Sequence, residues 1–140
     1  MTPDPTEARK VAITGPTAEK VGRMAAFADA WRMEAWPFDR EAECLAFLSG
    51  HSDVAGILVA DNQVEGCDTL IAWRAAGLTA PVLVLLSDRR HGPDDLARLI
   101  MAGAQDAQHL SASDQEIAAR MFRLTQHRAL GALTDMQEAA

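Results

Sequence analysis

Asp61 is the residue of this sequence whose type and position most clearly allow chemistry. It comes directly after the apolar run Gly56–Ala60, and Gly66 and Asp68 follow five and seven residues later. A carboxylate at the carboxyl end of a buried parallel strand lies in the crevice where open α/β sheets place their sites. There it can act as a nucleophile, and we expect Gly66 to let the following loop turn away from it. The segment therefore indicates a phosphoacceptor loop.

Asp61 can reach such a crevice only if strands and helices alternate along the chain. Short apolar or β-branched runs predict strands at 10–14, 32–36, 56–60, 81–86 and 107–110. Helical spacing and capping residues predict helices at 17–31, 39–50, 66–76, 93–102 and from 113 onward. Right-handed crossovers between these strands give a parallel sheet. We therefore predict an α/β, flavodoxin-like, doubly wound sheet with strand order 2-1-3-4-5 and helices on both faces.

The spacing from Asp61 through Asp68 resembles that of receiver domains of two-component response regulators. A second match is AGAQD, Ala102–Asp106, which is similar to a receiver signature before the last strand. The resemblance covers residues 10–128 and implies one receiver-like domain there. Residues 1–9 are then expected to be a flexible N-terminus, and residues 129–140 a C-terminal helical extension or linker.

In receivers an acidic pair at the end of the first strand holds Mg²⁺ together with the phosphoacceptor. In this sequence that place is taken by Thr14, Gly15 and Pro16. Asp61 is then the one anionic ligand expected, and a single carboxylate is a poor Mg²⁺ site. The resemblance therefore implies a degenerate receiver, or pseudo-receiver, with no resident metal and with weak or absent Mg²⁺ binding.

Receivers also carry a hydroxyl at the end of the fourth strand and a lysine, followed by proline, after the fifth. The hydroxyl position falls on Leu86, and Ser87 is one residue late, so that it can substitute only if the strand bulges. The lysine position falls on Leu110, next to His109, and Ser111 replaces the proline. Thr14, Gly15, Leu86, Ser87, His109 and Leu110 are accordingly interpreted as vestigial site positions around Asp61.

Simpler interpretations exist for the same charged residues. Asp61 can be a solvated loop aspartate, and Glu65 and Asp68 suit the first turn of a helix, where the dipole favours acids. His109 on an edge strand is usually exposed. Lys20 is expected to lie in the exposed first turn of the helix at 17–31.

Composition restricts the partners. The chain has 140 residues and a net charge of −7, with a sequence pI near 4.9. Nucleic acids and anionic membranes attract clustered Lys and Arg, so we expect neither as a partner. The sequence contains no apolar run long enough to span a membrane and no secretory signal. Cys44 and Cys67 lack paired metal-ligand spacing and suit a reduced, cytoplasmic protein.

The leading hypothesis is a non-catalytic signalling module that works by protein–protein contact. Its partner would be a kinase, an output domain, another regulatory protein or a second copy of the chain. The expected interaction face carries seven apolar residues of the last two helices: Leu96, Leu99, Ile100, Met121, Leu124, Leu130 and Leu133. Beyond Gly131 the apolar positions leave the stripe made by Met121 and Leu124, which indicates a different partner surface there.

Two alternatives remain. The first is an atypical phosphorelay receiver that is phosphorylated on Asp61 with help from Ser87. The second is a small flavodoxin-like enzyme or nucleotide binder. The first βα turn, TGPTAEK, lacks the glycine pattern of nucleotide-binding loops, which argues against this second alternative and favours a protein that is not an enzyme.

Overall fold

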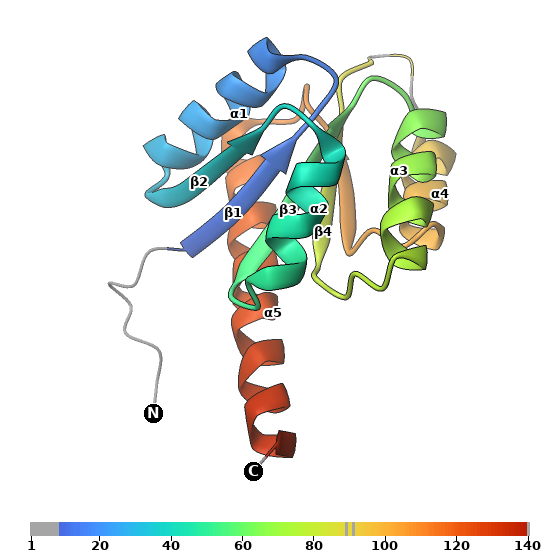
Figure 1. Cartoon of the computed structure of the whole chain (residues 1–140). Helices are drawn as coiled ribbons and strands as arrows, with labels where there is room; N and C mark the ends of the chain where they lie inside the picture. Colours follow the sequence, from blue (N-terminus) through green and yellow to red (C-terminus); the bar gives the residue numbers. More distant parts are fainter. Residues whose placement is uncertain (1–8, 89, 91, 140) are drawn as a thin grey trace.

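The computed structural model describes residues 9–88, 90 and 92–139, with side chains at 127 and 129–139 outside that description. Five strands form one sheet (Figure 1): β1 (Arg9–Thr14), β2 (Met33–Phe38), β3 (Val54–Ala60), β4 (Val82–Leu86) and β5 (Asp106–His109). Their order is β2-β1-β3-β4-β5, and every pair is parallel. The predicted sheet is confirmed. Arg9, expected in the flexible N-terminus, instead begins β1, because it pairs with Met33 of β2.

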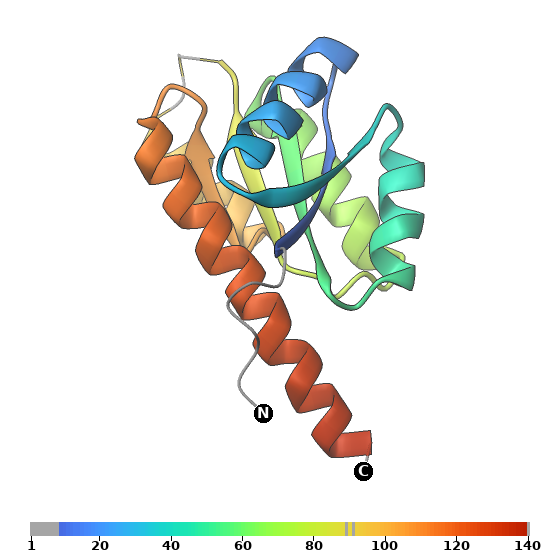
Figure 2. The same cartoon turned by 90° about the vertical axis from the view of Figure 1, so that its left-hand side faces the viewer.

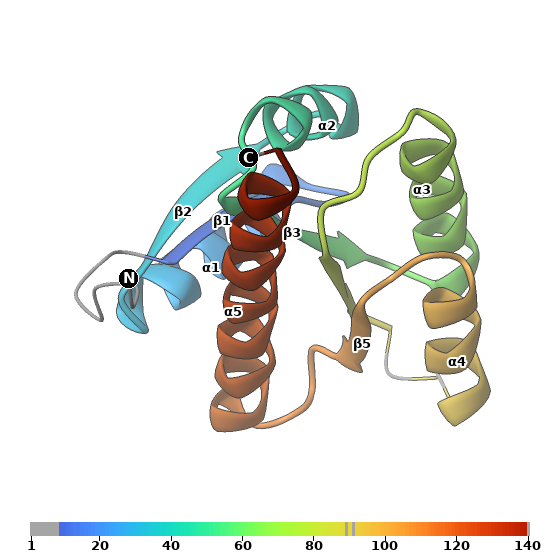
Figure 3. The same ribbon diagram turned by 90° about the horizontal axis from the view of Figure 1, so that it is seen from below.

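Five helices cover the two faces of the sheet: α1 (Ala18–Ala30), α2 (Glu41–Gly50), α3 (Gln63–Ala75), α4 (Pro93–Met101) and α5 (Asp114–Ala139). The view from below places α2, α3 and α4 on one side and α1 and α5 on the other (Figure 3). The buried side chains form two clusters that match these layers. The fold therefore has three layers, as the alternation of strands and helices predicts.

Strand β3 lies at the centre of both clusters. All seven of its residues are buried. Val54, Leu58 and Ala60 pack toward α2, α3 and α4, while Ile57 and Val59 pack toward α1 and α5. Such a strand is apolar throughout because it is covered on both faces. Asp61, the first residue after it, emerges at the carboxyl edge of the sheet.

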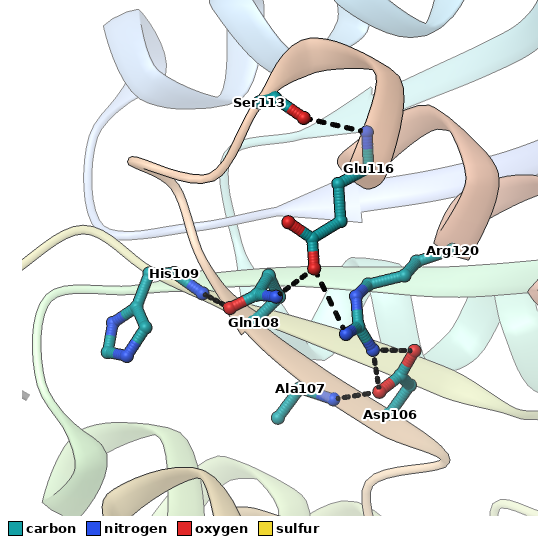
Figure 4. Close-up of polar contacts among 7 residues, drawn as sticks. All are labelled: Asp106, Ala107, Gln108, His109, Ser113, Glu116 and Arg120. Carbon is teal, nitrogen blue, oxygen red and sulfur yellow. Dashed lines mark hydrogen bonds and ion pairs between the residues drawn. The ribbon is translucent and has the colours of Figure 1, made fainter. Parts of the chain in front are cut away.

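Polar contacts fix α5 to the last strand (Figure 4). Ser113 Oγ accepts a hydrogen bond from the Glu116 amide at 3.2 Å and thereby caps the helix as predicted. Nη1 of Arg120 donates to both carboxylate oxygens of Asp106 in β5, at 2.7 and 2.8 Å. Glu116 accepts from Gln108 at 2.8 Å and pairs with Arg120 at 3.3 Å. These ion pairs and hydrogen bonds join β5 to α5 at the surface.

The remainder of α5 projects past the amino edge of the sheet (Figures 1 and 2). The helix is continuous from Asp114 to Ala139, so residues 129–139 of the expected extension prolong α5 without a break at residue 128. Within the described part of the chain, no helix has the length and apolar character needed to cross a membrane.

Three of the five predicted interaction-face residues whose side chains are described do not lie on the surface. Leu99 and Met121 are fully buried and Leu124 is 2% exposed, because each lies on the helix stripe that packs against the sheet. Leu96 is half-buried against the same core, and Ile100 is 49% exposed. The side chains of Leu130 and Leu133 lie outside the described residues.

Candidate functional site

Asp61 and Ser87 stand side by side at the carboxyl edge of the sheet. Strands β3 and β4 pair in register up to Ala60 and Leu86, and the Ser87 amide continues the ladder by donating to the Ala60 carbonyl at 2.9 Å. The next residue of each strand is therefore Asp61 and Ser87. The position predicted for Asp61, at the edge where parallel α/β sheets carry their sites, is confirmed.

Ser87 supplies the hydroxyl of this site without a bulge. Its Oγ donates to Asp61 Oδ1 at 2.9 Å, and the register of β4 against β3 is unbroken. Leu86, to which the hydroxyl position was assigned, is 1% exposed and packs in the core. The expectation that Ser87 needs a bulge to reach the site is wrong, because the register of β4 against β3 already places Ser87 beside Asp61.

Lys20 supplies a cation to the site, which its expected place in an exposed helical turn does not predict. Its Nζ lies 2.5 Å from Asp61 Oδ1 and 3.3 Å from Ser87 Oγ. Thr17 caps α1 by accepting from the Lys20 amide at 3.2 Å, and Val21 is buried in the core. These two contacts fix the rotation of α1, so that Lys20 faces the carboxyl edge of the sheet. The available signal was its position in the first turn after β1.

The contacts keep Asp61 ionised. The hydrogen bond from Lys20, followed by that from the Ser87 hydroxyl, lowers the pKa of Asp61 below its ordinary value. Both donors favour the charged carboxylate over the neutral acid. Lys20, Asp61 and Ser87, called the edge cluster below, therefore form an ammonium–carboxylate–hydroxyl arrangement supplied entirely by the chain.

The positions of the acidic pair do not fit a magnesium site. Thr14 is fully buried, and its hydroxyl donates to the Phe38 carbonyl at 3.1 Å. A Cβ atom added at Gly15 would lie 3.0 Å from Cβ of Val59 and 3.3 Å from the Val59 carbonyl oxygen. The backbone at Gly15 is thus packed against β3, which leaves a carboxylate side chain no room without a shift. Among the described residues, no group of three His, Cys, Asp or Glu side chains could hold a metal ion.

The end of β5 brings no cation to Asp61 from the predicted lysine position. Leu110 occupies that position, its amide donates to the Leu86 carbonyl at 2.8 Å, and its side chain packs against the core on the α1 and α5 side. His109 pairs with Leu86 and is half-buried, and its ring points away from the Arg120 network (Figure 4). The cation of the edge cluster therefore comes from α1 and not from β5.

Gly66 has a different role from the one expected. It lies inside α3, which begins soon after Asp61 because Asn62 caps it by accepting from the Glu65 amide at 2.9 Å. A Cβ atom at Gly66 would lie 2.8 Å from Cδ2 of Leu99 and 3.4 Å from Cβ of Ala60. The glycine allows α3 to approach the sheet and α4, and it does not serve a turn.

A small acidic pocket lies beside the edge cluster. Its volume is about 250 Å³, and its lining is Pro16, Glu41, Leu58, Val59, Ala60, Glu65, Asp68 and Thr69. Thr69 donates its hydroxyl to Glu41 at 3.0 Å. Glu65 lies in the first turn of α3, in keeping with the simpler interpretation, whereas Asp68 lies one turn further along the helix.

Solved structures resemble this architecture over most of its length. FixJ-N superposes with a TM-score of 0.64 at 23% identity, covering 87% of this chain and 97% of that one. The chemotaxis protein CheY4 of Vibrio cholerae gives a TM-score of 0.63 at 14% identity, with 84% and 99% covered. The chain has the receiver fold.

Other proteins with the receiver fold carry different descriptions. A CheY-like protein (tadZ) of Pseudomonas aeruginosa gives a TM-score of 0.59 at 16% identity and covers 83% of this chain and 93% of its own. No protein-family model matches the sequence, and the search of curated proteins found no match. At these identities the likeness establishes the fold, and the role of this receiver fold must be argued from its own residues.

Proposed function

We propose that this chain is a pseudo-receiver, a cytoplasmic signalling module of a bacterial two-component or related regulatory pathway. It acts by protein–protein contact, without Mg²⁺-dependent phosphorylation of Asp61, and it is not an enzyme. The observation that carries the proposal is that no carboxylate joins Asp61 at the place of the acidic pair, where Thr14 is fully buried and donates its hydroxyl to the Phe38 carbonyl. The close packing of Gly15 on Val59 supports it further.

The shape of the molecule supports a role in contact. Helix α5 leaves the sheet at the amino edge, opposite the edge that carries Asp61 (Figure 2). Its projecting part has Leu130 and Leu133 in sequence, in a phase different from that of the buried Met121 and Leu124. A helix that extends past its own domain offers a surface to a kinase, an output domain, a regulatory protein or a second copy.

A second candidate is an atypical phosphorelay receiver phosphorylated on Asp61. The observation that favours it is the same cluster in another use: Ser87 and Lys20 both reach Asp61 Oδ1 and could contact an added phosphoryl group. In this candidate Lys20 would neutralise phosphoryl oxygens as a point charge. The function would then depend on Asp61, whereas in the pseudo-receiver it depends on the projecting helix.

The two candidates are separated by comparing variants at opposite edges of the fold. We expect Leu130→Glu and Leu133→Glu to abolish self-association in sedimentation or partner capture from the native host, with a nearly unchanged thermal midpoint. We expect Asp61→Asn to retain these interactions and the cellular function. Normal association of both leucine variants, together with loss of function in Asp61→Asn, would overturn the pseudo-receiver in favour of the phosphoacceptor.

A further inference from the structure

Lys20 binds the same carboxylate oxygen that Ser87 binds. We propose that Lys20 is a built-in counter-ion of Asp61, which denies the carboxylate to divalent cations and holds the Ser87 hydroxyl turned toward the site. This inference rests on the proposed function, since it names the residue responsible for the metal independence of the edge cluster. Thr14 and Gly15 explain why carboxylate ligands are missing, whereas Lys20 would actively exclude divalent cations from Asp61.

The position of Lys20 is imposed by rigid parts of the fold. The chain leaves β1 through Gly15, which is packed against Val59 of β3, and enters α1 at the Thr17 cap. Val21 next to Lys20 is 1% exposed in the core. The ammonium is thus tethered close to Asp61, and a tethered group competes with free ions at a high effective concentration.

Charge makes this competition effective. Lys20 neutralises the one carboxylate of the edge cluster, and its ammonium repels a divalent cation that approaches the same oxygen. At a few ångströms such a repulsion is substantial even near a protein surface. The side chain of Asp61 is 44% exposed and that of Lys20 is 38% exposed. Burial therefore does not keep ions away from the carboxylate, and the charge of Lys20 must do so.

Ser87 links the contact to the rest of the molecule. Its hydroxyl contacts both charged groups, donating to Asp61 Oδ1 at 2.9 Å and accepting from Lys20 Nζ at 3.3 Å. Ser87 is also the first residue after β4, at the start of the connection to α4. Removal of the ammonium is therefore expected to alter the surroundings of the Ser87 amide as well as those of Asp61.

The chain provides a matched control at the other edge of the sheet. Lys10 Nζ pairs with Asp53 Oδ2 at 2.9 Å, with 39% and 57% of the two side chains exposed. The chemistry and the exposure of the lysine match those of the Lys20–Asp61 pair, whereas Lys10 lies in β1 away from Ser87. Lys10→Met therefore removes the same net charge without touching the edge cluster.

The experiment follows paramagnetic broadening of backbone amide signals while Mn²⁺ is added to the full chain. In the wild type and in Lys10→Met, we expect no selective broadening of Asp61 and Ser87 at millimolar Mn²⁺. In Lys20→Met and Lys20→Gln, we expect selective broadening at these amides at roughly tenfold lower Mn²⁺ or below, because the competing charge is gone. Both variants should keep the wild-type thermal midpoint within a few degrees, since Lys20 is partly exposed.

Equal broadening at Asp61 and Ser87 in the wild type and in both Lys20 variants would overturn the inference. The same gain in Lys10→Met would also overturn it, because the effect would then be one of net charge. Failure of the proposed function is read separately, from phosphorylation of Asp61 in the wild type. A wild type that stays unphosphorylated, together with unaltered Lys20 variants, would refute the counter-ion and leave the pseudo-receiver standing.

Discussion

Asp61 Oδ1 accepts hydrogen bonds from two side chains that come from different parts of the sequence. Lys20 reaches it from α1 and Ser87 from the end of β4. A motif counted along the chain predicts Asp61, since its place after β3 is local. It gives Ser87 only as a substitute that needs a bulge, and it does not place Lys20 at the site, because the offset between strands and the rotation of a helix are fixed only by packing.

The edge cluster predicts the titration of Asp61. With the Lys20 hydrogen bond as the largest cause, its pKa is lowered, so the carboxyl carbon should titrate below its ordinary value of 3.8. Lys20→Met should raise the midpoint, and Lys10→Met should leave it unchanged. Carbon-detected NMR across acidic pH measures these midpoints, and an ordinary pKa in the wild type would contradict the assigned contact.

The same shift gives a stability effect with a defined sign. A carboxyl group whose pKa is lowered by folding stabilises the fold at pH values above its pKa in the unfolded chain. This contribution is lost as the pH falls through the pKa in the folded protein. Because both side chains are more than a third exposed, we expect this contribution to be no more than roughly 1 kcal/mol. The edge cluster is thus expected to contribute little to the stability of the fold.

At the scale of elements, the approach of α3 to the sheet depends on a missing side chain. Gly66 lies under Leu99 of α4 and over Ala60 of β3, with 2.8 Å between its built Cβ and Leu99 Cδ2. The sequence shows the glycine but suggests a turn, because Gly66 also fits the loop of the resembled family. The close approach appears only when three elements are placed together.

Substitution of Gly66 tests this packing. We expect Gly66→Ala to destabilise the fold by about 1–3 kcal/mol, the usual cost of an extra methyl group in a filled core. Gly22→Ala is the control, since Gly22 is exposed on α1 and a Cβ there meets nothing within 4 Å. It should be neutral or stabilise by up to about 1 kcal/mol. Denaturant unfolding measures both, and equal stabilities would refute the packing role of Gly66.

Apolar stripes on helices explain why three residues of the predicted interaction face are buried. Leu99, Met121 and Leu124 recur at helical spacing, and that spacing indicates a buried stripe without saying what buries it. In this fold the sheet covers all three. The same reasoning predicted the sheet well, because a continuous apolar strand such as β3 has one common use, the centre of a parallel sheet.

At the scale of the whole molecule, the two edges of the sheet differ in character. The carboxyl edge holds the edge cluster, in which Lys20 and Ser87 both donate hydrogen bonds to Asp61. The amino edge is where α5 departs from the domain (Figure 2). The function that we propose, protein–protein contact, would depend on the projecting helix and not on the edge cluster.

Phosphorylation of the intact wild-type chain tests the pseudo-receiver proposal most directly. The protein is incubated with acetyl phosphate and Mg²⁺ and examined by intact-mass spectrometry, with Asp61→Ala as control. We expect no added phosphate on either protein, because Lys20 contacts Asp61 Oδ1 and the packing of Gly15 leaves no room for a second carboxylate. A phosphate carried by the wild type and absent from Asp61→Ala would contradict it.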